Sequence, residues 1–189
     1  MDYIGTWKEV MLKPSEFYRK MPKTGGYRDP LTFAAITFLI YGILTAIFNR
    51  EMYMTGMHGG MYGGENYFGE FGLSMIISIA ILAPIAGVIS LFIEAIILYI
   101  IYRILGGDGS YEGTVRFIAY ASAVLLLSWI PLIGWIIGLY GIYLQIVGGM
   151  YVHNVSMLKS AIAVLLPTIL LFILMIILIG AMVAFLGVI

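Results

Sequence analysis

Glu94 is the one acidic residue inside the long apolar stretches of this sequence, and Gln145 lies at a matching depth in another stretch. Glu94 precedes Arg103 by nine residues, and Gln145 precedes His153 by eight. At about 1.5 Å per helical residue, both side chains lie ~12–13 Å from the polar ends of their stretches. We predict a polar layer at this depth, formed by Glu94, Gln145, Ser90, Ser122, Tyr41 and Thr168.

This layer has two chemical interpretations. It could bind or pass a proton, an ion or a small solute, because ionisable groups inside a membrane commonly mark such pathways. It could instead be a hydrogen-bonded clasp between two packed helices. The single acid, with no basic residue at the same depth, favours the clasp.

Small residues accompany both polar side chains at helical spacing. One stripe holds Ala83, Gly87, Ser90 and Glu94, and the other holds Gly134, Gly138, Gly141, Gln145 and Gly148. Such stripes let helices approach closely, so we predict that the two helices pack face to face through Glu94 and Gln145. The Gly134/Gly138 pair also permits a homo-oligomer.

A second cluster of candidate ligands is rich in methionine. It consists of Met52, Met54, Met57, His58 and Met61. Thioethers with an imidazole could bind a soft cation such as Cu(I). The alternative is a loop of glycine, tyrosine and methionine packed on the membrane surface. We favour this alternative, because methionine is abundant throughout the chain, with twelve copies.

The remaining polar motifs do not indicate catalysis. The glycine-rich segment 106–110 lacks the Lys-Ser/Thr ending of a phosphate-binding loop, and we expect it to be a tight turn before a helix. His153 is expected to be a polar residue snorkelling at the membrane interface. Without cysteines or a Ser/His/Asp set, the sequence predicts neither an enzyme nor a cofactor, and its zero net charge gives no support for a nucleic-acid partner.

Composition identifies the elements that must position these groups. Apolar residue types make up 62% of the chain and charged residues only 11%, which is typical of a polytopic membrane protein. We predict an all-α bundle of five membrane spans after an N-terminal segment, residues 1–30, that is cytoplasmic or interfacial. The spans are expected at about 31–48, 71–105, 114–130, 132–152 and 160–187.

The stretch 71–105 is the ambiguous one, because it contains Pro84 and could be one long helix or two short spans. One helix leaves nine basic residues on the side of the N-terminus and only Arg50 on the other, whereas two helices give six against four. Basic residues collect on the cytoplasmic side, so we predict one helix, a cytoplasmic N-terminus and an outer C-terminus in the cell membrane.

Several motifs resemble a known family in order and spacing. They are Trp7, Pro14-Ser15-Glu16-Phe17-Tyr18, Gly25-Gly26, the segment Gly106 to Thr114, Phe117 to Ala121, Ile130 to Gly134, Gly148 to His153, and Lys159-Ser160-Ala161. The chain resembles the prokaryotic branch of the Yip family, integral membrane proteins named for interacting with Rab-type GTPases. The resemblance implies five spans and a cytoplasmic N-terminus. It also leads us to expect a proline where this chain has Val124.

Together these features favour a non-catalytic membrane scaffold or adaptor. It would contact the lipid bilayer and recruit protein partners at its cytoplasmic face, through the N-terminal segment and the loop at Gly106. The alternative is a small channel or transporter that uses the layer around Glu94 and Gln145.

The basic asymmetry gives a direct test of orientation. A cysteine introduced at Gly187 should react with an impermeant thiol reagent added outside the cell, whereas one at Thr24 should not. The reverse pattern would refute the orientation, and labelling of both positions would refute an odd number of spans.

Overall fold

The computed structural model describes residues 2–48, 68–185 and 187, and every regular element within them is a helix. The elements are α1 (Tyr3–Leu12), α2 (Pro14–Lys20), α3 (Arg28–Phe48), α5 (Phe68–Ile104), α6 (Tyr111–Ala121), the 3-10 turn η1 (Ser122–Val124), α7 (Leu125–Ser128), α8 (Ile133–His153) and α9 (Met157–Phe185). Local signals fix several ends. Asp2 and Ser110 cap α1 and α6 by accepting from backbone N–H groups, and Asn154 closes α8 in the left-handed conformation.

Four helices are long and apolar enough to cross a membrane: α3, α5 from Ile77 onward, α8 and α9. They match four of the predicted spans. The stretch predicted at 71–105 is one continuous helix with Pro84 inside it, so the prediction of a single helix is confirmed.

The remaining predicted span, 114–130, differs from expectation. The α-helix α6 has only 11 residues and is followed by η1 and the four-residue α7. A bilayer needs ~20 helical residues. Within the described residues, four helices can therefore span a membrane by length and composition, where we predicted five. The break falls near Val124 without the proline that the resemblance implied, and the Ser122 hydroxyl donates to the Ala119 carbonyl beside it.

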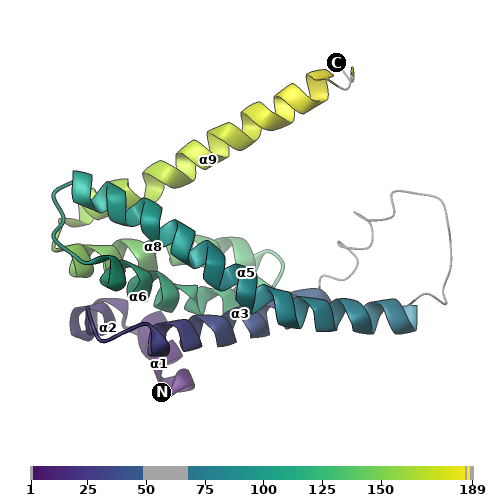
Figure 1. The fold of residues 1–189 in the computed structure, drawn as a ribbon, viewed down its shortest axis with the longest axis horizontal. Helices are drawn as coiled ribbons and strands as arrows, with labels where there is room; N and C mark the ends of the chain where they lie inside the picture. The colour runs from purple at the N-terminus through teal and green to yellow at the C-terminus, as the bar shows by residue number, and fades with distance from the viewer. Residues whose placement is uncertain (1, 49–67, 186, 188–189) are drawn as a thin grey trace.

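The short helix α6 forms the centre of the bundle. Every residue from Gly113 to Ala121 is buried. Helices α3, α5 and α8 pack around α6, and α3 and α5 lie side by side (Figure 1). This position explains why a segment with Glu112 and Arg116 can be buried: its neighbours are protein, so its polar groups find partners there.

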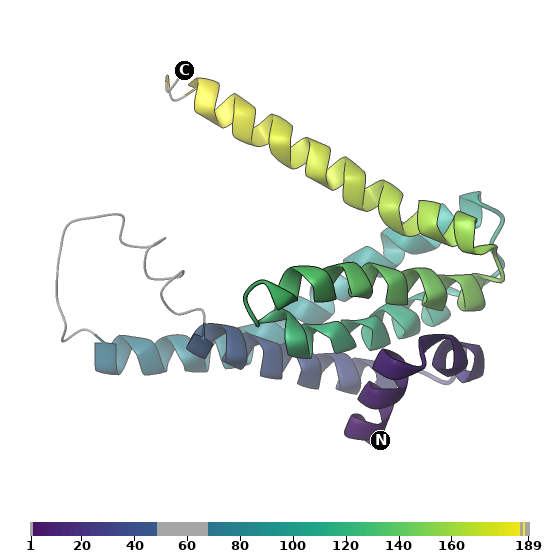
Figure 2. The same cartoon turned by 180° about the vertical axis from the view of Figure 1, so that it is seen from behind.

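Helix α9 leaves the bundle after its first turns. Its buried residues are Ser160, Ala163 and Val164, all before Pro167. Beyond Pro167 its apolar side chains are exposed, and both views show the helix extending away from the other elements (Figure 1, Figure 2). A bare apolar helix of this kind needs lipid around it.

The N-terminal helices α1 and α2 pack along one flank of the bundle. The Tyr3 hydroxyl bonds to that of Thr37 at 2.8 Å, the Trp7 indole N–H donates to the Ala123 carbonyl at 2.9 Å, and the Tyr140 hydroxyl donates to the Met11 carbonyl at 2.6 Å. Val10 and Tyr18 are fully buried there. The N-terminal segment is therefore helical over most of its first twenty residues, and its buried side chains are part of the packed core.

Two glycines of α8 offer a matched test of this packing. A Cβ on Gly149 would collide with the Tyr102 hydroxyl, which is hydrogen-bonded to Ser160 at 2.7 Å, whereas a Cβ on Gly138 would meet nothing within 4 Å. Gly149→Ala should therefore lower the unfolding free energy in detergent by about 1–3 kcal/mol through overpacking. Gly138→Ala should be neutral or stabilising, because alanine favours helix. Equal effects of the two substitutions would contradict this packing.

Candidate functional site

Glu94 on α5 and Gln145 on α8 meet directly. The Gln145 side-chain Nε2 donates to Glu94 Oε1 at 2.6 Å. The hydroxyls of Ser90, Ser122 and Thr168 donate to carbonyls of their own helices. Among the described residues of this layer, the amide–carboxyl contact is the hydrogen bond that joins α5 to α8.

Two cavities adjoin this pair. One, of about 360 Å³, has Ser90, Glu94, Ser122, Gln145 and Thr168 among its lining residues. The other, of about 330 Å³, lies between α5, α8 and α9 and shares all of these except Ser122. Tyr41 lines neither cavity, so the structure brings together five of the six residues predicted for the layer.

These cavities set what the layer can do chemically. No lysine, arginine or histidine lines either one, so Glu94 has no cationic partner from the residues that surround it. Its carboxyl group can hold a proton, accept a donor from a solute in the cavity, or serve only as the acceptor for Gln145.

The predicted contact between the two helices through Glu94 and Gln145 is present, but the small residues of the two stripes face other neighbours. On α5, Ala83 lies against Gly42 of α3, and Gly87 lies against the ring of Phe38. On α8, Gly141 lies against Val124 and Gly148 against Phe117. Each stripe therefore accommodates bulky or close neighbours on α3 or on the α6–η1 segment. At the depth of this layer, the long side chains of Glu94 and Gln145 bridge the space between α5 and α8.

The Gly134/Gly138 pair is divided between two environments. A Cβ on Gly134 would strike the Ser128 carbonyl of α7, so this glycine serves a contact within the chain. Gly138 faces open space and lines the larger cavity of the layer.

The methionine cluster predicted as a metal site, from Met52 to Met61, lies outside the described residues.

A second polar cluster, at the loop end of the bundle, was not predicted as a site. The Gly26 N–H donates to Glu112 Oε1 at 2.6 Å, and the Arg116 guanidinium donates to the Gly26 carbonyl at 2.6 Å. Arg116 also lies 3.9 Å from Glu112. Gly25 and Gly26 have φ of 119° and 86°, which glycine adopts without strain. The linker between α2 and α3 is thereby fixed to the central helix.

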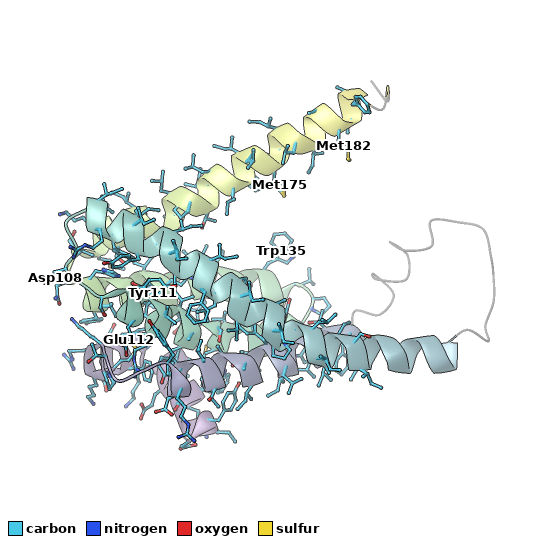
Figure 3. The ribbon with its side chains drawn as sticks, in the orientation of Figure 1. Asp108, Tyr111, Glu112, Trp135, Met175 and Met182 are labelled. Carbon is cyan, nitrogen blue, oxygen red and sulfur yellow. The ribbon has the colours of Figure 1, made fainter. Side chains whose placement is uncertain are left out.

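The same end carries a chain of bonds between loops. Lys23 donates to the Asn154 side chain at 3.1 Å, and Asn154 donates to the Asp108 carboxylate at 2.8 Å. Lys159 Nζ donates to the Leu105 carbonyl at 2.8 Å. Figure 3 shows Asp108, Tyr111 and Glu112 together at this end, far from Met175 and Met182 on α9. The starts of α3, α6 and α9 and the ends of α5 and α8 thus converge in one place.

His153 is buried here and does not snorkel at the interface as expected. Its ring stacks on Tyr102, with centroids 4.1 Å apart and an interplanar angle of 5°. Its Nε2 shares a hydrogen bond of 2.9 Å with the Thr114 hydroxyl. A Cβ on Gly109 would lie 2.9 Å from its Cγ, so the glycine-rich loop closes directly over the imidazole.

On the N-terminal flank, the hydroxyl of Tyr18 is buried between α2 and α6. Burial raises the pKa of the Tyr18 hydroxyl well above its ordinary value, so it stays neutral and donates to the Phe117 carbonyl at 3.4 Å. The glycine-rich motifs could have suggested close approaches, but nothing in the sequence pairs Gly26 with Glu112 or Gly109 with His153.

The described residues hold four long apolar helices, three of which pack around a buried short helix, and this is the architecture of a multi-pass integral membrane protein. The family model of the Yip1 domain matches residues 8–179. The chain therefore belongs to the Yip family, and the resemblance drawn from its motifs is confirmed at the level of the family. No curated protein and no solved structure matches the chain.

The contact between Glu94 and Gln145 can be tested by a double-mutant cycle. Glu94→Gln should be mild, because an amide oxygen still accepts from Gln145. Glu94→Leu should destabilise more, because it leaves the Gln145 amide without that acceptor. Coupling energies of such pairs average ~0.6 kcal/mol, so a coupling of about that size is expected from unfolding of Glu94→Leu, Gln145→Leu and the double variant. Strict additivity would mean that the side chains do not interact.

Proposed function

We propose that this protein is a non-catalytic membrane scaffold or adaptor that recruits protein partners at its cytoplasmic face. The observation that carries the proposal is the attachment of the N-terminal helices to the bundle. Trp7, Met11 and Tyr18 bond to α6, η1 and α8, while Gly26 is held by Glu112 and Arg116.

These contacts favour binding because they fix the N-terminal helices before any partner arrives. A surface fixed in advance loses less conformational entropy on binding than a mobile tail does. The fixed surface exposes charged side chains of both signs, namely Lys8, Glu9, Lys13, Glu16, Arg19 and Lys20. A partner of complementary charge would dock on them.

The proposed topology has five crossings, with a cytoplasmic N-terminus and an outer C-terminus. The segment α6–η1–α7 provides the additional crossing. The bundle encloses α6 and most of η1, and α7 is half-buried, so most of this broken segment need not face lipid. The convergence of helix ends at the loop cluster supports this path, because α3, α6 and α9 leave that end while α5 and α8 return to it.

A channel or transporter is the second candidate, favoured by the cavities of about 360 and 330 Å³ beside Glu94. The hydrogen bond from Gln145 to Glu94 favours the scaffold, because the carboxyl group already accepts a donor from the protein. Transport would require Glu94 to exchange this partner for a proton or a solute.

A paired experiment distinguishes the two functions. For a scaffold, proton and alkali-cation flux into proteoliposomes should be unchanged by Glu94→Gln. A photo-crosslinking residue placed at Arg19 should give discrete protein adducts in native membranes, while one placed at the exposed, apolar Ile100 should give none. Flux that disappears in a folded Glu94→Gln protein would establish transport and refute the scaffold.

A further inference from the structure

Polar groups reach different depths along the bundle on its different flanks. On the flank of α1 and α2, bonded contacts reach Ala123 and Tyr140, which lie 12 and 13 residues from the loop ends of their helices. At about 1.5 Å per residue this is roughly 18–20 Å along the bundle. On α5, by contrast, Ile96, Ile100 and Ile104 expose apolar surface up to the last residue of the helix.

A bilayer can satisfy both flanks only if the bundle tilts or the leaflet dips beside α1 and α2, because charged side chains are costly in hydrocarbon. Either adjustment brings lipid headgroups to the level of the N-terminal helices. The exposed apolar residues on α1 agree with contact to the leaflet, since Ile4 is 64% exposed and Leu12 is 75% exposed. Isolated apolar side chains beside lysines are typical of interfacial helices.

A cleft of about 530 Å³ opens between α1 and α2 at this level. Phe17, Met21 and Tyr120 line it, and the rings of Phe17 and Tyr120 pack edge to face with centroids 5.0 Å apart. Leu12 contributes further apolar surface. The cleft therefore offers a hydrophobic wall next to a surface that faces headgroups.

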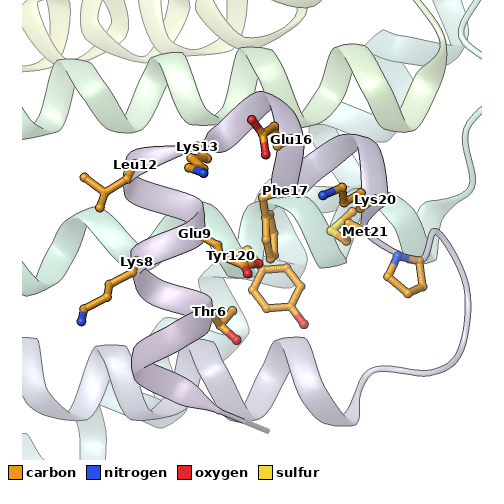
Figure 4. Close-up of a pocket in the computed structure, with 11 residues that line it drawn as sticks. Thr6, Lys8, Glu9, Leu12, Lys13, Glu16, Phe17, Lys20, Met21 and Tyr120 are labelled. Carbon is orange, nitrogen blue, oxygen red and sulfur yellow. The ribbon is translucent and has the colours of Figure 1, made fainter.

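Charged groups surround this wall. Lys8, Lys13 and Lys20 line the cleft together with Glu9 and Glu16, which leaves an excess of one positive charge. In the described part of the chain, none of the three ammonium groups forms an ion pair or a side-chain hydrogen bond. Figure 4 shows Lys13 and Lys20 on either side of the Phe17 ring, whereas Lys8 points away. Two unpaired ammonium groups beside an apolar wall match an anion with an attached hydrocarbon chain.

We propose that this cleft binds an anionic phospholipid of the adjacent leaflet. Lys13 and Lys20 hold the headgroup phosphate, and the apolar wall contacts the glycerol and the first methylenes of the acyl chains. A lysine near a membrane surface contributes measurable attraction to anionic lipid, and two acting on one phosphate give a selective site. The cleft shares Lys13 and Lys20 with the surface proposed above for protein partners. The experiment below measures lipid binding to the purified chain with no protein partner present, so either proposal can fail without the other.

The test uses the full chain purified in a neutral detergent and titrated with phosphatidylglycerol or phosphatidylcholine, with bound lipid counted by native mass spectrometry. We expect saturable binding of phosphatidylglycerol that exceeds that of phosphatidylcholine. The variant Lys13→Gln/Lys20→Gln should bind phosphatidylglycerol about tenfold more weakly. Arginine at both positions should retain binding.

The matched control is Arg19→Gln/Arg28→Gln, which removes two positive charges from exposed positions that do not line the cleft. It should bind phosphatidylglycerol within about twofold of the unaltered protein. Equal losses in the two double variants would overturn the proposal by assigning the binding to general surface charge. Helical circular dichroism and the thermal midpoint without lipid confirm that each variant is folded.

Two further titrations separate the lipid from other anions. Inorganic phosphate should fail to displace phosphatidylglycerol at equal concentration, because it lacks the apolar part that the cleft wall contacts. Displacement by phosphate, or preferential binding of a glutamate-rich peptide over phosphatidylglycerol, would overturn the lipid assignment.

Discussion

Tyr102 joins the elements on which the loop end of the bundle depends. Its ring stacks on His153 and packs edge to face against Phe117, while its hydroxyl bonds to Ser160 above Gly149. One fully buried side chain thereby connects α5 to α6, α8 and α9. Glycine is favoured around this pair, because a larger residue at Gly109 or Gly149 would need space that the His153 ring or the Tyr102 side chain occupies. A larger residue at Gly107 would press on the His153 Cβ and the Tyr102 carbonyl.

The buried charge of Arg116 depends on the same end of the bundle. Arg116 is only 5% exposed, so its charge needs compensation within the protein. Its guanidinium donates to the carbonyl of Gly26 and lies 3.9 Å from the Glu112 carboxylate. The linker before α3 is therefore an electrostatic partner of the central helix. The N-terminal helices, held by that linker on one side and by Trp7 on the other, become part of the core.

The sequence predicted well the features that depend on one helix alone, namely where the long helices lie and how deep a residue sits along them. Long apolar runs predicted four helices correctly, and counting residues from Arg103 and His153 placed Glu94 and Gln145 at a common depth. The sequence did not predict features that depend on contacts between distant segments. The break at Ser122 lies in a helix buried by Trp7 and Tyr18, more than ninety residues away. The packing of the glycine stripes depended equally on Phe38, Val124 and Phe117, which spacing alone could not select.

The sparse contacts of α9 have a consequence for how the chain matures. Its buried residues end at Val164, so the network around Tyr102 and Ser160 contains no residue beyond that point. During synthesis, the loop end of the bundle can therefore assemble as soon as the first turns of α9 are available. We expect the rest of α9 to partition into lipid as a separate step, driven by its own apolar surface and not by the completed bundle.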